Sequence, residues 1–261
     1  MTTGELRLTV RRQEDRHIFE ESYFSGAFKL SKPLNKNGVP LYYLLHVGGG
    51  YVSGDEYRQT FHLLSKAALY LTTQSATKVY KGKVPARQET IIKLEEDSHL
   101  TLLQDPVILY ENAIFHQITH VHLGENSTFH YSEIFTPGWS AEGKHFTYRE
   151  LYSDFQLMLN GKKLLVDRLR FNGQQRSVIQ LADYTHYGTY ICINQVPDCV
   201  FEQLISFKIE DVCLGFSKIQ QYGFTVKVLA YSTGQIEKVI ADIDALVRRE
   251  IGMSPLSIRK F

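Results

Sequence analysis

The stretch YRELYSDFQLMLNGKKLLVDRLRF, residues 148–171, holds two apolar runs on either side of a single tight turn. Asn160-Gly161 is that turn, and Asn-Gly between apolar runs is a strong hairpin signal because both residues tolerate positive φ angles. The flanking runs, Tyr148–Leu159 and Leu164–Phe171, have the apolar and aromatic content of strands. The stretch therefore predicts two paired β-strands and favours a β interpretation of the chain around it.

Much of the remaining chain has the same strand pattern. Apolar runs, several of them with polar–apolar alternation, are separated by turn residues such as Asn35–Gly38, Gly124–Asn126 and Asn172-Gly173. The further predicted strands are Arg7–Arg11, Arg58–Leu64, Thr90–Leu94, Leu100–Leu103, Ile114–Leu123, Thr128–Ile134, Leu214–Ile219 and Phe224–Tyr231. Because hairpin turns join neighbouring strands, these signals predict a mainly β fold, a large and mostly antiparallel β assembly.

Two segments depart from the strand pattern and predict α-helices, near 197–211 and 235–251. In the first, the apolar residues fall on one helical face, and Pro197 suits a first helical turn. In the second, apolar residues recur at spacings of three and four along the whole segment. Ser232 with Gln235 resembles a capping box just before it.

The composition restricts the class of protein. The chain has 261 residues with 29 Lys and Arg against 28 Asp and Glu, a formal charge of +1. This balance argues against nucleic-acid or membrane partners, and no apolar run approaches the ~18 residues of a membrane span. Cys192, Cys199 and Cys213 form no Cys-x-x-Cys pair, which argues against a disulfide framework and favours a reducing compartment. Without a signal sequence or a linker, we expect one domain over residues 1–261 and a cytoplasmic location.

Tyrosine and phenylalanine are abundant, with 16 and 15 residues against one tryptophan. A Tyr/Phe-rich β core is one explanation, because aromatic residues suit half-buried pleated surfaces. A surface for a partner protein is the other, because the same residues are enriched at the centres of interfaces.

The segment from His46 to Glu56, HVGGGYVSGDE, is the first candidate functional motif. Gly49 and Gly54 have the spacing of a phosphate-binding loop, but Asp55 and Glu56 stand where that loop requires a lysine and a hydroxyl. Because two carboxylates repel phosphate, we reject nucleotide binding. The turn instead presents two acids that suit a hard or borderline metal cation. The alternative is a plain hairpin whose acids face water.

Three histidines, His116, His120 and His122, share sequence parity and therefore face one side of a predicted strand. The last two would lie roughly 6.5–7 Å apart, and paired imidazoles at that spacing can bind zinc or nickel. The sequence fixes no third ligand, so a polar strand face in solvent is the alternative. No nucleophile elbow or other standard catalytic arrangement is present in the sequence, and we assign no catalytic residue.

Taken together, several segments resemble the UreD (also called UreH) family of urease accessory proteins. Gly48–Glu56 resembles that family's GG-x-V-x-GD signature, and Leu71–Tyr80 resembles its TT-x-x-ATK-x-Y segment. Leu103–Phe115 resembles its PDPVI-x-x-x-x-A-x-F stretch. Gly215–Ile219 and Gly223–Leu229, followed by a helix, match its closing pattern. Each block is weak alone, but together they occur in family order.

The resemblance implies one UreD-like domain that acts as a non-catalytic maturation chaperone. Members of that family join UreF and the GTPase UreG on apo-urease and help to deliver nickel to its active site. The family fold is mostly β with two helices, and it carries an internal polar tunnel proposed as the nickel route. The resemblance places Asp55, Glu56 and Thr77 at tunnel-associated positions. It implies transient contact with Ni²⁺ and no tightly bound cofactor.

One block departs from the family pattern. GR-x-A-x-GE-x-F appears here as Gly138–Phe146, with Trp139 in place of the arginine and Lys144 in place of the glutamate. Glu133 and Glu142 are nearby acids that could substitute for that glutamate. Two other functions stay open, namely a pure scaffold without ion contact and a metal-dependent hydrolase built on the three histidines.

Overall fold

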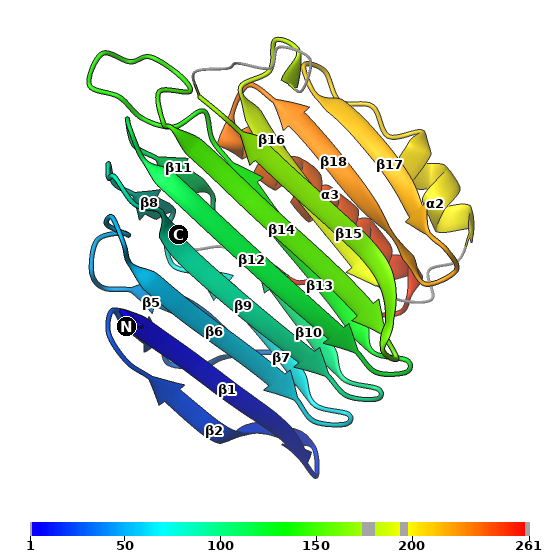
Figure 1. Ribbon diagram of the computed structural model, residues 1–261. Coiled ribbons are helices and arrows are strands. Elements are labelled where there is room, and N and C mark those ends of the chain that lie inside the picture. The colour runs from blue at the N-terminus through cyan, green and yellow to red at the C-terminus, as the bar shows by residue number, and fades with distance from the viewer. Residues whose placement is uncertain (1, 174–180, 194–197, 259–261) are drawn as a thin grey trace.

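The computed structural model of the chain describes residues 2–173, 181–193 and 198–258. In this part of the chain two β-sheets, sheet A and sheet B, lie face to face, and the long helix α3 covers the outer side of sheet B (Figure 1). The prediction of a mainly β fold is confirmed.

Sheet A has seven strands in the order β15-β14-β12-β9-β6-β1-β2. Their bounds are β1 Gly4–Gln13, β2 Arg16–Phe24, β6 Glu56–Leu63, β9 Ala86–Leu94, β12 Ile114–Leu123, β14 Glu150–Leu159 and β15 Lys162–Phe171. Neighbours from β1 to β14 are parallel, and the two edge pairs are antiparallel. The β14–β15 hairpin turns at Asn160 and Gly161, both with positive φ, as the sequence predicts.

Sheet B has eleven strands, eight of them in the order β17-β18-β16-β13-β10-β7-β5-β3; β4 pairs with β5, and β11 pairs with β13 and β8. Its strands are β3 Phe28–Leu30, β4 Leu34–Lys36, β5 Val39–His46, β7 Ala68–Thr73, β8 Thr77–Val79, β10 His99–Leu103, β11 Val107–Leu109, β13 Thr128–Phe135, β16 His186–Ile193, β17 Cys213–Ile219 and β18 Gly223–Ala230. The strands from β5 to β13 are parallel, and those from β13 to β17 are antiparallel.

The prediction of mostly antiparallel pairing is wrong for the centre of both sheets. Nine of the strand pairings in the described residues are parallel and seven are antiparallel. The reason is that turns such as Gly124–Asn126 join a strand of sheet A to a strand of sheet B. Consecutive strands run in opposite directions but lie in different sheets, so each sheet collects parallel strands.

The two predicted helices are present with adjusted bounds. α2 is Asp198–Ile205, shorter than the predicted 197–211, and Pro197 lies outside the described residues. α3 is Thr233–Glu250, close to the predicted 235–251. Ser232 caps α3 by accepting a hydrogen bond from the backbone N–H of Gln235. The apolar face of α3 packs on β16 and β18 to form a second core outside sheet B.

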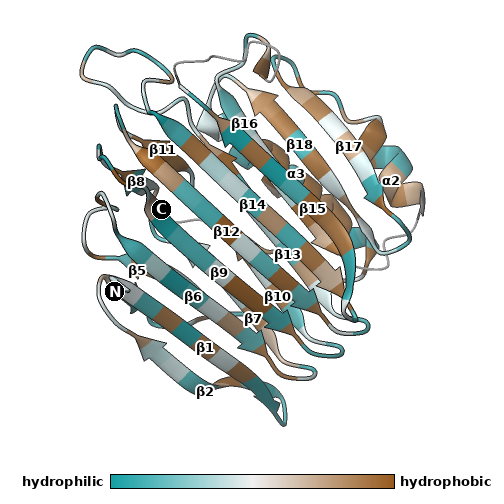
Figure 2. Cartoon of the chain, in the orientation of Figure 1, coloured by the Kyte–Doolittle hydropathy of each residue, from teal (hydrophilic) through white to brown (hydrophobic). Residues whose placement is uncertain are grey.

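Alternation along the strands decides which side chains enter the space between the sheets. On β6, β9 and β12 every second residue is buried, and most of these residues join one apolar cluster with the inner side of sheet B. Figure 2 shows the alternation as hydrophilic and hydrophobic bands along the front sheet. The inward positions that carry polar residues stand out against this cluster.

Candidate functional site

Amide side chains project into the interior from three adjacent strands of sheet A. Gln59 on β6, Gln88 on β9 and Gln117 on β12 are all buried. The parallel register places Gln117 beside Gln88, and Gln88 beside Tyr57 of β6. A buried amide without a partner costs ~1–3 kcal/mol, so such groups normally make hydrogen bonds. Gln88 and Gln117 each have a hydrogen-bond partner in the interior.

A cavity of about 150 Å³ lies beside the glycine turn, and its lining includes His46, Tyr51, Thr77 and Gln88. The Tyr51 hydroxyl donates a hydrogen bond to Gln88 Oε1 at 2.6 Å. Both ring nitrogens of His46 are buried, and neither has a hydrogen-bond partner within the described part of the chain. A buried imidazole left unpaired beside a polar cavity indicates a place for water or a ligand.

The Asp55 carboxylate influences the groups around this cavity. Its Oδ2 accepts a hydrogen bond from the backbone N–H of Val52 at 2.8 Å, which fixes the side chain across the turn. Burial lowers the pKa of His46, and the negative charge of Asp55 raises it by less. The net pKa is below its usual value, so the imidazole is neutral at pH 7. Burial, assisted by Asp55, raises the pKa of Tyr57 to about 12. A neutral imidazole near a carboxylate supplies the donor atoms that a borderline cation prefers.

A buried carboxyl group, Glu133 on β13, lies on the same interior side of the sheets. Gln117 Nε2 donates a hydrogen bond to Glu133 Oε2 at 2.8 Å, and the Tyr131 hydroxyl donates to the same oxygen at 3.2 Å. Burial raises the pKa of Glu133 to about 7, although the charge of Lys227 and these hydrogen bonds act in the other direction. The charge of this carboxyl group therefore changes close to neutral pH.

Lys227 on β18 and Asp167 on β15 extend the polar groups from Glu133 toward the surface. The Lys227 ammonium donates hydrogen bonds to the Asp167 carboxylate and, at 3.0 Å, to Thr189 Oγ1. Both charged side chains are partly exposed. Polar groups thus occur from the glycine turn, through the interior, to an ion pair that water can reach.

The residues predicted from the glycine motif and from the family resemblance do not all lie in this interior. Thr77 lines the cavity, and Asp55 acts on the cavity groups His46 and Tyr51. Glu56 starts β6 with the alternation that places the neighbouring Tyr57 inward, so it belongs to the outer side of sheet A. Sequence reasoning gave His46 no role, although its place directly before the glycine turn is a signal that could have identified it.

The three histidines of β12 share one face, as predicted, and that face is the outer side of sheet A. His116 Nε2 lies 3.2 Å from Glu150 Oε1. Burial, then Lys93 and His120, lower the pKa of His122. No group of three metal-binding side chains occurs among the residues that the structure describes. The structure therefore separates the histidines from the polar interior, and metal binding by them stays a prediction.

The divergent segment Gly138–Phe146 lies on the surface. Trp139 is half exposed, and Glu142 forms an ion pair with Lys144 at 2.5 Å. Of the two acids named as substitutes, Glu142 is exposed and Glu133 is buried in the interior. Only Glu133 therefore lies among the polar groups described above.

Comparison with known proteins identifies the family. The model of the UreD urease accessory protein family matches residues 2–260. This chain belongs to the UreD family. The UreD protein of a Bacillus species (strain TB-90) is 37% identical over 99% of both chains, and that of Lachnoclostridium phytofermentans is 36% identical over 99% of this chain and 98% of its own. A Staphylococcus aureus UreD protein is 32% identical over 95% of this chain and 94% of its own.

The resemblance found in the sequence motifs is therefore confirmed at the level of the whole chain. The UreD relatives are named as urease accessory proteins. Within the described residues, none of the helices has the length and apolar character needed to cross a lipid bilayer.

Proposed function

We propose that this UreD-family protein is a non-catalytic chaperone of urease maturation in the cytoplasm. It docks with UreF and the GTPase UreG on apo-urease and helps to deliver Ni²⁺ to the urease active site through its polar interior. The series of polar groups from the half-buried His46 and Asp55 at the glycine turn to the buried Glu133 is the observation that carries this proposal.

The chemistry of these groups suits transfer of an ion. A conduit needs successive weak ligands, because a tight site would trap the ion and an apolar wall would leave it without solvation. His46 offers unpaired imidazole nitrogens, and Asp55 lies close enough for its charge to act on this ring. Glu133 gives a carboxyl group that exchanges a proton near pH 7, and metal binding to such a group releases that proton.

The test measures nickel per urease active site, with urease purified from cells that lack the chain or carry a variant of it. Glu133→Gln keeps the shape of the side chain and removes its ability to ionise. Asp55→Asn does the same at the glycine turn. We expect urease that is assembled but poor in nickel in the deletion strain and in both variants. Glu89→Gln is the matched control, because Glu89 lies on the outer side of sheet A beside Arg58.

The outcomes separate the three functions. Full nickel loading by Glu133→Gln and Asp55→Asn, with loss in the deletion strain, would identify a scaffold without ion contact. Equal nickel in the deletion and complemented strains would contradict a role in maturation. A tightly held metal at one per chain, lost in His120→Ala with His122→Ala, would instead favour the histidine-based hydrolase.

A further inference from the structure

One end of the molecule, opposite to the turns that follow β6, β9 and β12, is formed by loops 47–55, 80–85, 110–113 and 137–149, which we call the loop end. Four of the ten exposed large apolar side chains among the described residues lie there. Val47, Val52, Val84 and Trp139 are 63%, 52%, 58% and 51% exposed. Among the described residues, none of the exposed large apolar side chains lies in the opposite turns 64–67, 95–98 or 124–127. Apolar side chains gathered at one end indicate a binding surface, whereas scattered ones do not.

Trp139 is held in place by other aromatic rings. Its ring lies 4.9 Å from that of Tyr110, which lies 4.8 Å from that of Tyr80. The Tyr80 hydroxyl donates a hydrogen bond to the carbonyl of Gly49 at 3.1 Å. These three residues come from three successive loops and form a row of rings whose last member is half exposed. Tryptophan and tyrosine of this kind, already ordered before binding, are frequent anchors of interfaces.

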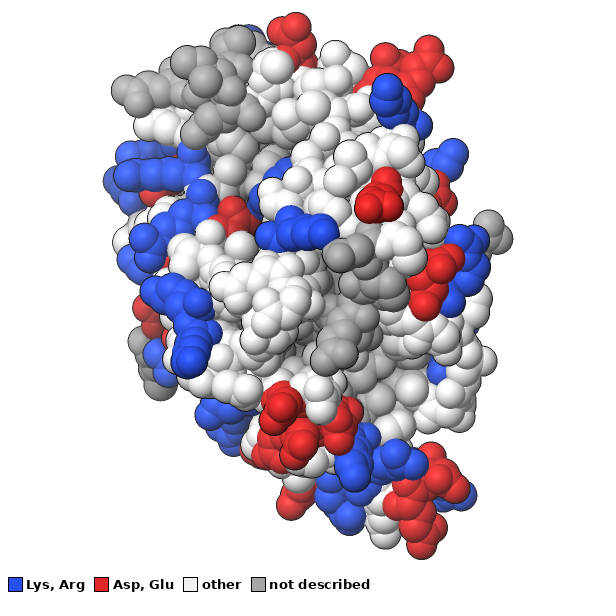
Figure 3. Space-filling view, turned by 90° about the vertical axis from the view of Figure 1, so that its right-hand side faces the viewer, with Lys and Arg blue, Asp and Glu red and all other residues white. Residues whose placement is uncertain are grey.

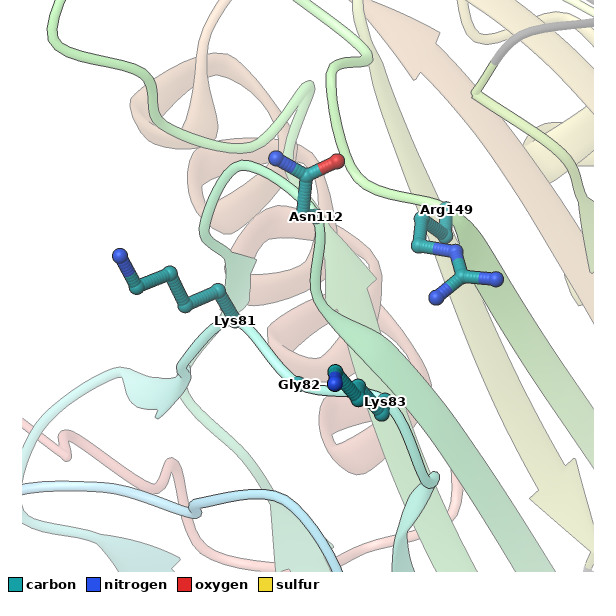
Figure 4. Close-up of a pocket in the computed structure, with 5 residues that line it drawn as sticks. All are labelled: Lys81, Gly82, Lys83, Asn112 and Arg149. Carbon is teal, nitrogen blue, oxygen red and sulfur yellow. The ribbon is translucent and has the colours of Figure 1, made fainter.

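An open groove of about 560 Å³ lies in the same loops and is lined by Lys81, Gly82, Lys83, Asn112 and Arg149 (Figure 4). All three ionisable side chains of the groove are cationic. In Figure 4 they spread from two loops into open space. In the part of the chain that the structure describes, none of the three forms an ion pair. Carboxylates of a ligand can therefore bind these cations without breaking an ion pair within the chain.

Backbone contacts hold the groove in a fixed shape. The Ser53 hydroxyl accepts hydrogen bonds from the backbone N–H groups of Lys83 and Val84, both at 3.1 Å. The Gly82 N–H donates to the Asn112 carbonyl at 3.2 Å. A side chain at Gly82 would overlap Ser53, because a Cβ there would lie 2.3 Å from the Ser53 Cβ. Little ordering is therefore needed on binding, which lowers its entropic cost.

The charges at the far end differ from those of the groove. Glu95, Glu96 and Asp97 share one turn, and the Asp97 N–H donates to the carbonyl of Glu125 in the next turn. Figure 3 shows a group of acidic side chains low on one face of the molecule, with Lys and Arg side chains directly beside it. A formal charge of +1 therefore comprises local groups of both signs. Steering of a partner follows such local fields.

We propose that the loop end is a docking surface for an acidic segment of a partner protein. Carboxylates of that segment bind in the groove of Lys81, Lys83 and Arg149, and an apolar side chain of the segment covers Trp139 and Val84. This proposal does not depend on nickel delivery, because it concerns binding alone.

Intrinsic fluorescence tests the proposal directly, because Trp139 is the single tryptophan of the chain. The probes are a decapeptide of glutamates with one central leucine, the same peptide with glutamine for glutamate, and the same peptide with glycine for leucine. We expect the first to shift the emission to the blue as Trp139 is covered, and added salt to weaken its binding. The glutamine peptide should not bind measurably, and the glycine peptide should bind more weakly.

Matched variants locate the site. Lys81→Gln with Lys83→Gln, both exposed, should raise the Kd of the glutamate–leucine peptide by about tenfold. Lys162→Gln with Lys163→Gln, also exposed but at the β14–β15 hairpin, should change it less than about twofold. Equal effects of the two double variants would overturn the proposal, as would peptide binding seen by anisotropy without any change in Trp139 emission. Displacement by inorganic phosphate at equal concentration would indicate a small-anion site, and a shift that depends on protein concentration alone would indicate a second copy.

Discussion

Replacing Asp244 of α3 by alanine is expected to destabilise the protein more than any other change to a single acid on that helix. Asp244 is buried, and its carboxylate accepts hydrogen bonds from Arg248 Nε at 2.6 Å and the Tyr190 hydroxyl at 2.9 Å, with His130 Nδ1 at 2.7 Å. Arg248 is also fully buried, and its Nη2 donates a hydrogen bond to Thr101 Oγ1 at 2.7 Å. The network thus joins α3 to β10, β13 and β16 of sheet B.

The magnitude follows from the charge that the substitution leaves behind. Without Asp244, Arg248 becomes a buried cation without its counter-ion, and breaking a buried pair in this way costs about 3–5 kcal/mol. A change of 1 kcal/mol lowers Tm by roughly 2–4 °C for a chain of this size, so Tm should fall by about 6–20 °C. Burial opposes ionisation of Asp244, but His130 and Arg248 outweigh it and hold the pKa below its usual range.

Urea unfolding at pH 7 followed by circular dichroism measures this cost. Asp242→Ala is the matched control, because Asp242 is an exposed aspartate two residues earlier on the same helix, and it should change stability by less than about 0.5 kcal/mol. Because the folded pKa of Asp244 is depressed, its contribution is present above the unfolded pKa of ~3.9 and is lost as pH falls below it. Equal stability of the two alanine variants at pH 7 would refute this reasoning.

Three further predictions concern other regions. The pKa of Glu133 is raised to about 7, so the free energy of unfolding should fall as pH rises from ~4.5 to 7, by up to ~1.4 kcal/mol per pH unit. Urea unfolding at several pH values measures this dependence, and Glu133→Gln should remove it. Gly188→Ala should lower stability by ~1–3 kcal/mol in the same assay, because its Cβ would lie 2.4 Å from Ile236 Cγ2 of α3. If His120 and His122 form a weak metal site, His120→Ala with His122→Ala should abolish Ni²⁺ binding in isothermal titration calorimetry; unchanged binding would place the ion elsewhere.

The sequence predicted local features more successfully than the pairing of strands. The Asn160-Gly161 hairpin and the Ser232-capped helix α3 depend on interactions within a few residues, and both are present. The parallel centre of each sheet depends on which sheet receives the next strand after a turn such as Gly124–Asn126. That choice is set by packing between the sheets, and turn residues carry no information about it.

In the candidate site, too, local features were predicted and contacts between distant strands were not. The glycine turn and Asp55 were identified because their residue types and spacing are informative alone. Glu133 and Gln117 lie 16 positions apart on strands of different sheets, and their hydrogen bond exists only because those strands face each other. Alternation along a strand assigns residues to two faces but does not say which face is inside. It therefore cannot predict that these two residues are buried on facing strands.

Strand β12 demonstrates how much depends on that choice of face. Its odd-numbered residues, including Gln117 and Thr119, point into the interior, while His116, His120 and His122 point outward. Because strand neighbours are parallel and in register, Gln117 lies beside Gln88 of β9 and Ser153 of β14, so polar residues of three strands meet at one level. A register shift of one residue would bring the histidines inside and place the amides in solvent. The polar interior is therefore a property of register across several strands, and variants that alter single inward side chains without disturbing the pairing are the appropriate test of its role.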